Sequence, residues 1–211
     1  MNQLSSLTDT PVAVVIFIIT LGLSLLAFYN EEFYSRSILQ PYSVARGERI
    51  YTLLTSGLIH RDWQHLLFNM MSYYFFAFNL ERVLGHWQFA LLYVASLILS
   101  DLPTVIKHRN DYWYRSLGAS GAISAVVFSF IVFFPFASMY ILVIPFPIKA
   151  ILFGALYLVY CVYASRRGLG NINHDAHFYG ALCGIVITII LDPRVIPHFV
   201  LQFNNLIKGL N

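Results

Sequence analysis

The sequence predicts an all-α integral membrane protein, a bundle of six transmembrane helices in a single domain, residues 1–211. Its composition is 58% hydrophobic and only 11% charged, with a mean hydropathy of +0.68, outside the range of soluble globular domains. Six apolar stretches each approach the roughly 20 residues that a helix needs to cross a bilayer core of about 30 Å. The formal charge of +3 is small and scattered, which argues against nucleic acid as a partner.

The predicted spans follow one another with short polar connections, except after the first. Residues 11–29 form the first span; Met1–Thr10 before it holds no basic residue and no cleavage pattern follows it, so we expect a retained helix rather than a signal peptide. The remaining spans are predicted over residues 63–80, 86–106, 116–135, 145–164 and 174–191. Residues 193–211 place apolar side chains at helical spacing, which predicts a short interfacial helix.

A serine between glycines opens the fourth span. Ser120 lies in the string Gly-Ala-Ser-Gly, between Gly118 and Gly121. The string is similar to the nucleophile elbow of serine hydrolases, but that motif requires a strand-to-helix turn, and here membrane-grade apolar residues follow. A helix interface of small residues explains the glycines equally well. The string alone therefore leaves catalysis and packing open.

Two other predicted spans carry polar residues near their starts. His65 and Asn69 are four residues apart, which puts them on one face of the second span. Alone, such a pair more often holds helices together than catalyses a reaction. His177 shares a face of the sixth span with Gly180 and Gly184, a flat strip that another helix can approach closely.

Counting crossings brings these residues to one depth. The starts of spans two, four and six lie on the same side, so His65, Asn69, Ser120 and His177 are placed in the outer part of the same leaflet. A serine nucleophile needs a base, and histidine suits that role near neutral pH. Side chains of Asn and His, with the Ser120 N–H, are suitable oxyanion donors. Asp175 is offset by two residues from His177 and points away, which predicts a dyad rather than a triad.

At these residues the sequence resembles the rhomboid family of intramembrane serine proteases. The match covers, in order, HRDWQHLLFNM at 60–70, ERVLG at 81–85, GASG at 118–121 and HDAHFYGALCG at 174–184. The resemblance implies Ser120 as nucleophile, His177 as general base, and an oxyanion hole formed by His65, Asn69 and the Ser120 N–H. It implies that Gly180 and Gly184 pack span six against span four, and it implies no metal or cofactor. The partners it implies are the lipid bilayer and single-pass transmembrane substrates, cleaved near the membrane surface through an acyl-enzyme.

The chain departs from the family pattern at two places. Tyr51-Thr52 stands where many bacterial members carry Trp-Arg in the first loop. Ser124 stands where many members have an aromatic residue that stacks on the catalytic histidine. Support for His177 must then come from elsewhere in the chain.

Two alternatives accompany this interpretation. A catalytically silent rhomboid-like protein that binds transmembrane segments is the second candidate function, and Ser124 is the local hint in its favour. A metal site built from the histidines at 60, 65, 174 and 177 would leave Ser120 and Asn69 without a role.

The location of the protein is predicted from its form and its charges. The compact six-span form favours the inner membrane of a bacterium. Most Lys and Arg residues lie on the side of the predicted site, which the positive-inside rule assigns to the cytoplasm. The resemblance places that side outside, and we adopt that orientation.

Overall fold

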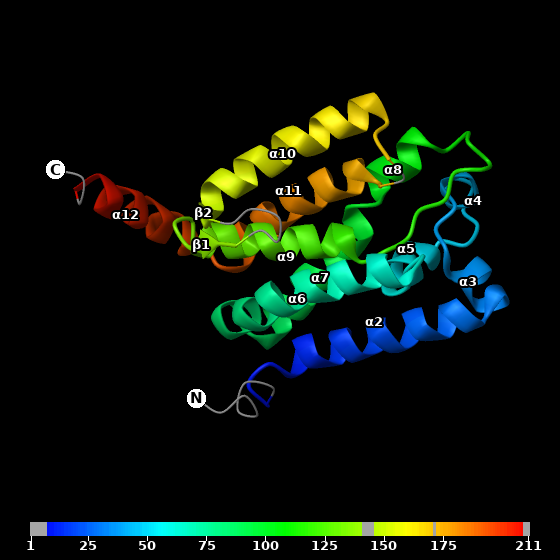
Figure 1. The fold of residues 1–211 in the computed structure, drawn as a ribbon, viewed down its shortest axis with the longest axis horizontal. Coiled ribbons are helices and arrows are strands. Elements are labelled where there is room, and N and C mark those ends of the chain that lie inside the picture. The colour runs from blue at the N-terminus through cyan, green and yellow to red at the C-terminus, as the bar shows by residue number, and fades with distance from the viewer. Residues whose placement is uncertain (1–7, 141–145, 171, 209–211) are drawn as a thin grey trace.

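The computed structural model describes residues 8–140, 146–170 and 172–208, and these are mostly helical (Figure 1). The helices are α2 (Pro11–Tyr29), α3 (Glu31–Ser37), α4 (Pro41–Val44), α5 (Thr52–Thr55), the 3-10 helix η1 (Ser56–Leu58), α6 (Trp63–Leu84), α7 (His86–Leu99), α8 (Leu102–Lys107), α9 (Ser120–Phe133), α10 (Ala150–Arg167), α11 (His174–Leu191) and α12 (Val195–Lys208). Within the described ranges, strands are confined to an antiparallel pair of two residues each, β1 (Ser138–Met139) and β2 (Ile148–Lys149). The predicted all-α membrane bundle is confirmed.

The helix bounds differ from the predicted spans at several ends. α6 continues to Leu84, four residues beyond the predicted end. The stretch 86–106 divides into α7 and α8, and Pro103 falls in the first turn of α8, where its missing N–H costs nothing. α9 begins at Ser120 rather than 116, because Ser116 instead pairs with Leu39 in an isolated antiparallel bridge. α10 runs from Ala150 to Arg167 instead of over 145–164, because residues 148–149 pair with β1 as a short strand. Residue 145 and the tail at 209–211 lie outside the described residues.

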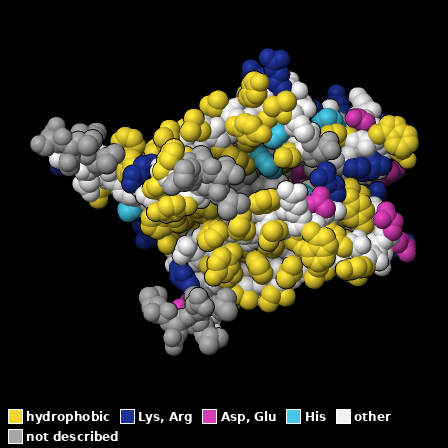
Figure 2. All heavy atoms as spheres, in the orientation of Figure 1, with side chains coloured by type: hydrophobic (Ala, Val, Ile, Leu, Met, Phe, Trp, Pro, Cys, Tyr) yellow, Lys and Arg dark blue, Asp and Glu magenta, His cyan; other side chains and the backbone are white. Residues whose placement is uncertain are grey.

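Apolar side chains cover the outer faces of the long helices (Figure 2). Ile18 of α2, Val159 of α10 and Ile190 of α11 are exposed by 61%, 68% and 68%. Among the described residues, three stretches are long and apolar enough to cross a membrane: Pro11–Tyr29, His86–Lys107 and His174–Leu191. These exposed faces suit contact with lipid, and the count of six spans stays a prediction.

α9 is the central helix of the bundle. Figure 1 shows it between α10 and α11 on one side and α6 and α7 on the other. Eleven of its 14 residues are buried, and its most extensive contact is with α11. Gly180 and Gly184 make this contact possible: a Cβ on either would overlap the backbone of Gly121 or Ala125. The predicted packing strip therefore lies against α9.

Glu81 joins the first helix to the bundle. Its buried carboxylate accepts hydrogen bonds from the backbone N–H groups of Val12 and Ala13, at 3.1 and 2.6 Å, in the first turn of α2. These N–H groups have no acceptor within the helix, and a negative charge is favourable at a helix N-terminus. His86 contacts the same carboxylate at 2.6 Å. The ERVLG stretch thus fixes α2, α6 and α7 to one another.

The loop between α2 and α6 folds into short helices at one end of the bundle. Arg49 holds it: its guanidinium donates to the carbonyl oxygens of Ser35 and Arg36 at 2.5 and 3.0 Å. Tyr51 donates to the Arg36 carbonyl at 3.2 Å. Arg49 and Tyr51 therefore fasten this loop at the place where the sequence departs from Trp-Arg.

Candidate active site

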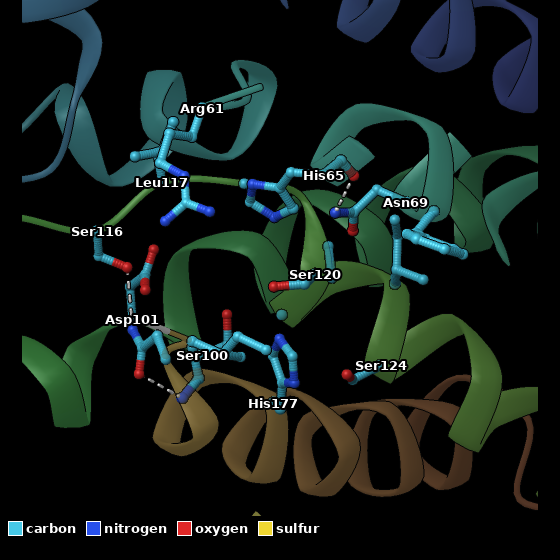
Figure 3. Close-up of a pocket in the computed structure, with 18 of the residues that line it drawn as sticks. Arg61, His65, Asn69, Ser100, Asp101, Ser116, Leu117, Ser120, Ser124 and His177 are labelled. Carbon is cyan, nitrogen blue, oxygen red and sulfur yellow. Dashed lines mark hydrogen bonds between the residues drawn. The ribbon is translucent and has the colours of Figure 1, made fainter. Parts of the chain in front are cut away.

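A cavity of about 980 Å³ opens at the end of the bundle that carries these short helices (Figure 3). The four polar residues predicted to converge, His65, Asn69, Ser120 and His177, all line it. They come from three helices, α6, α9 and α11. Gly118 and Gly121 also line the cavity, whereas Gly180 and Gly184 lie behind it in the contact between α9 and α11.

Ser120 is the first residue of α9. The first backbone N–H groups of a helix have no acceptor within it, and they carry the positive end of the helix dipole. The N–H of Ser120 is therefore a donor placed beside the Ser120 hydroxyl, as an oxyanion site requires. Ser120 in the string Gly-Ala-Ser-Gly thus begins a helix, as in a nucleophile elbow, although a loop and not a strand precedes it.

Gly118 lies in this loop, so it does not pack helix against helix as predicted. Its φ of +114° is one that residues with a Cβ rarely adopt. A Cβ here would also stand 2.6 and 2.7 Å from the Cε1 and Nε2 atoms of His65. Gly118 donates its N–H to the Ser56 carbonyl at 2.9 Å. The loop therefore passes flat against the His65 imidazole.

The start of α6 fixes His65 and Asn69. Asp62 caps this helix, with its Oδ1 accepting the N–H of His65 at 2.8 Å. That hydrogen bond and the neighbouring Arg61 side chain hold the pKa of Asp62 below its usual range. Asn69 is buried, and its Nδ2 donates to the His65 carbonyl at 3.0 Å. An amide nitrogen has two donors, so one is left for another acceptor.

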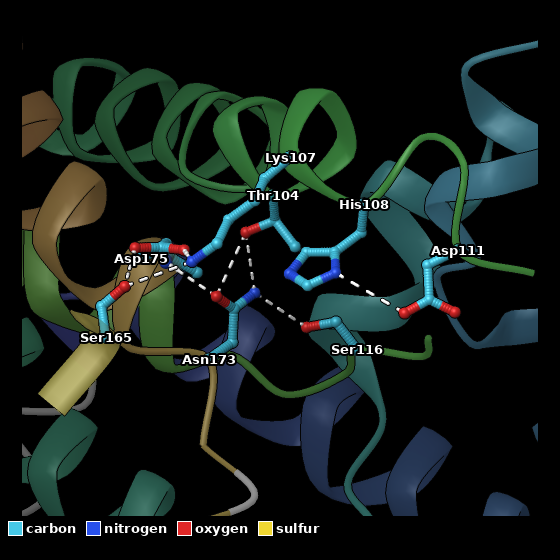
Figure 4. Close-up of polar contacts among 9 residues, drawn as sticks. Thr104, Lys107, His108, Asp111, Ser116, Ser165, Asn173 and Asp175 are labelled. Carbon is cyan, nitrogen blue, oxygen red and sulfur yellow. Dashed lines mark hydrogen bonds and ion pairs between the residues drawn. The ribbon is translucent and has the colours of Figure 1, made fainter. Parts of the chain in front are cut away.

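His177 lies one turn into α11, which Asn173 caps (Figure 4). The Oδ1 of Asn173 accepts the Ala176 N–H, and its Nδ2 donates to the hydroxyls of Ser116 and Thr104, each at 3.0 Å. One side chain thus ties the start of α11 to the loop before Ser120 and to α8. The placement of His177 relative to Ser120 depends on these bonds.

Ser120 and His177 face the same cavity without a mutual hydrogen bond in the described part of the chain (Figure 3). A change of the Ser120 rotamer moves its hydroxyl between staggered positions. Catalytic hydrogen bonds are often long or misaligned before substrate binds. Asp175 instead binds Lys107 and Ser165, in agreement with its predicted separation from His177.

The histidines near the site show no metal-binding arrangement. The rings of His60 and His65 meet edge to face at a centroid distance of 4.9 Å, and those of His174 and His177 at 6.0 Å. No group of three or more His, Cys, Asp or Glu side chains suited to a metal occurs within residues 8–140, 146–170 and 172–208.

Two cavity residues were missed by the sequence analysis. Asp101, at the break between α7 and α8, lines the cavity and is only 9% exposed. Tyr157 of α10 lines the cavity beside His177 and shares a hydrogen bond of 2.9 Å with Ser124. No local motif marks Tyr157, because its partners lie on two other helices.

Comparison with known families shows which family the chain belongs to. The family model described as "Rhomboid domain" matches residues 47–194, a range that includes every residue named above at the cavity. The chain belongs to the rhomboid family. This rhomboid domain carries both the Ser120 string and the His177 helix in one match.

Named relatives cover different parts of this rhomboid chain. It is 39% identical over 129 residues to "Putative rhomboid protease YdcA" of Bacillus subtilis, covering 57% of this chain and 63% of that protein. It is 26% identical over 196 residues to "RHOMBOID-like protein 12, mitochondrial" of Arabidopsis thaliana, covering 85% and 58%. A third relative, 26% identical over 157 residues, is "Inactive rhomboid protein 1" of Drosophila melanogaster, covering 74% and 10%. The chain thus spans less than two thirds of the length of each.

Proposed function

We propose that this rhomboid-family protein is an intramembrane serine endopeptidase that uses a Ser120–His177 dyad. The observation that carries the proposal is the meeting of Ser120, His177, His65 and Asn69 at one cavity, from three separate helices. A packing role explains each pair separately, but packing does not require a hydroxyl, an imidazole and spare N–H donors to face a shared open space. Acyl transfer requires all of them.

In the proposed acylation step, the Ser120 Oγ attacks the carbonyl carbon of the scissile peptide while its proton passes to the His177 imidazole. The negative charge on the carbonyl oxygen is stabilised by the Ser120 N–H and by donors from Asn69 and His65. The C–N bond then breaks, and His177 returns the proton to the leaving amine. A water molecule hydrolyses the acyl-enzyme by the same route in reverse.

The proposed substrates are single-pass transmembrane proteins, cleaved near the membrane surface where their helix is partly unwound. An intact helix hides its peptide carbonyls in hydrogen bonds, so attack requires local unwinding. The cavity reaches from polar residues of the first loop to apolar Phe76 and Phe153, so it can receive a segment that leaves lipid for water. The proposed location is the inner membrane of a bacterium.

A fluorophosphonate probe tests the proposal, because it reacts with activated serines. Purified protein in mild detergent is incubated with the probe and compared with Ser120→Ala and His177→Ala. We expect labelling of the wild type and loss of labelling in both variants. Ser129→Ala is a control on the same helix, since Ser129 also lies on α9 but is fully buried and bonds to Thr188 away from the cavity. Labelling that persists in Ser120→Ala would remove Ser120 from its role.

The silent membrane-segment binder is the alternative that the same experiment addresses. The missing hydrogen bond between Ser120 and His177 and the relative named inactive are the observations in its favour. A wild type that is folded, as judged by circular dichroism and a cooperative melting transition, yet unlabelled would favour this function.

A further inference from the structure

Tyr157 stands beside His177 in an arrangement that neither the family pattern nor the local sequence predicts. Its ring plane lies 12° from that of the imidazole, at a centroid distance of 6.3 Å, so the two rings are parallel and offset. Its hydroxyl shares a hydrogen bond of 2.9 Å with Ser124 of α9. One side chain of α10 thus contacts both the helix of the nucleophile and the helix of the base.

The surroundings of Tyr157 hold its ring in one orientation. The rings of Phe128 and Phe153 pack against it at centroid distances of 5.7 and 5.8 Å. Gly154, three residues earlier on the same face of α10, brings this helix close to α9: a Cβ there would lie 3.1 Å from the Ile131 Cδ1 and 3.3 Å from Phe128. The ring is thereby fixed by packing and its hydroxyl by a hydrogen bond.

Such a ring limits the motion of its neighbour. An imidazole at the wall of an open cavity can rotate between side-chain rotamers, and only some of them point a ring nitrogen at the serine. A flat, immobile aromatic face parallel to the imidazole removes some of these rotamers. Among the described residues, His177 has no carboxylate partner to orient its ring, so packing must do it.

We propose that Tyr157 is a positioning residue for His177, with Ser124 anchoring its hydroxyl. The proposal rests on the proposed function, because it assigns the support of the catalytic base. Ser124 then no longer argues for a catalytically silent protein. It binds the hydroxyl of Tyr157, whose ring lies beside His177 in place of an aromatic residue at position 124.

A specific consequence concerns an aromatic residue at position 124. Ser124 is 5% exposed and its Oγ already touches Tyr157, so a ring at this position would compete with the Tyr157 ring for the space beside His177. Ser124→Phe alone should therefore lower activity instead of improving it. Combined with Tyr157→Ala, the new ring takes over the vacated space, and activity should return.

The rate of fluorophosphonate labelling across pH 5–9 measures the effect in the full chain. We expect Tyr157→Leu, which keeps an apolar side chain but no ring, to slow labelling at least tenfold and to displace its pH midpoint. Tyr157→Phe and Ser124→Ala both remove the anchoring hydrogen bond but keep the ring, so both should slow labelling by about threefold, less than Tyr157→Leu does. Ser124→Phe should slow labelling at least tenfold, and Ser124→Phe with Tyr157→Ala should recover most of the loss.

Two results would overturn the proposal. One is labelling of Tyr157→Leu at the wild-type rate and with the wild-type pH profile. The other is equal slowing in Tyr157→Leu and in Gly154→Leu at equal loss of melting temperature, which would reduce Tyr157 to general packing of α10.

A measurement that needs no activity separates this inference from the proposed function. In protein carrying isotope-labelled histidine, the His177 ring signal is identified by its loss in His177→Ala. We expect it to shift or broaden in Tyr157→Leu and to stay in place in Ser124→Ala. If the His177 signal responds to Tyr157→Leu but the wild type is not labelled by the probe, the proposed protease function is refuted and the ring contact stands. If the His177 signal is unchanged in Tyr157→Leu, the positioning role is refuted even in an active enzyme.

Discussion

Gly180 of α11 lies against the backbone carbonyl of Gly121, the residue that follows Ser120 on α9. The two helices that carry the proposed dyad therefore meet without side chains between them. The neighbouring contact, Gly184 against Ala125, repeats the arrangement one turn further along. The separation of Ser120 and His177 is set by this backbone contact.

Replacing Gly180 by Ala should separate α9 from α11. The added Cβ would meet the backbone of Gly121, which cannot rotate away, so we expect a loss of about 1–3 kcal/mol of stability. Labelling by the fluorophosphonate should fall more steeply than stability, because the dyad is pushed apart. Melting temperature and labelling rate measured on the same preparation check both effects.

Gly22→Ala is the matched control for this variant. Gly22 is in the middle of α2 and a Cβ there meets nothing within 4 Å, so only helix propensity acts, in favour of Ala by about 1 kcal/mol. We expect unchanged labelling and an equal or higher melting temperature. A Gly180→Ala protein that behaves like Gly22→Ala would show that the helix contact is loose.

Asn173→Ala should weaken the start of α11. It removes the N-cap and the bonds to Ser116 and Thr104, and losing a cap alone costs about 0.5–2 kcal/mol. Asn173→Asp keeps the cap acceptor but lacks the two amide donors. We therefore expect the melting temperature to recover largely in the Asp variant while labelling stays low. Full labelling in Asn173→Asp would mean that the amide donors are not needed to position His177, since the Ser116 and Thr104 hydroxyls can donate to a carboxylate instead.

The sequence was informative where a residue type and its spacing determine the chemistry. The apolar periodicity and composition predicted the helical membrane bundle, and counting crossings placed Ser120, His65, Asn69 and His177 together. The sequence predicted helix ends less well. The break between α7 and α8 at Asp101 and the start of α9 at Ser120 instead of 116 depend on the loop between α8 and α9, which pairs with Leu39, far away in the chain. The sequence did not predict that Tyr157 lies beside His177, because this depends on how α10 packs against α9 and α11.

Asn69→Ala tests the proposed oxyanion hole. If Asn69 is one of several donors, its loss should raise the barrier by about 1–3 kcal/mol, which makes cleavage about fivefold to 150-fold slower. Asn69→Asp is the informative companion, since it keeps the size of the side chain but replaces the donor with an acceptor. Both variants should bind a transmembrane substrate as the wild type does and lose turnover. Unchanged turnover in Asn69→Ala would reassign this residue to helix packing.

His60 predicts how stability depends on pH. It lies before α6, fully buried, with its Nδ1 2.9 Å from the Ser24 hydroxyl and its ring against that of His65. Burial, assisted by the neighbouring His65, lowers the pKa of His60 to about 3. In the unfolded chain His60 therefore binds a proton near pH 6.5, whereas in the folded chain it stays neutral until about pH 3. The folded state consequently loses stability as pH falls from about 6.5 towards 3.

The expected slope from this one group is at most about 1.4 kcal/mol per pH unit. Melting temperatures between pH 8 and pH 4 should fall more steeply in the wild type than in His60→Gln, which has no imidazole to titrate. The Gln variant starts from a lower stability at pH 8, because its fit beside Ser24 and His65 is poorer, so the slope is the informative quantity. His198→Gln, which removes an exposed histidine of α12, should keep the wild-type slope. Parallel slopes for the wild type and His60→Gln would show that His60 stays neutral in the unfolded chain as well, or is protonated in both states.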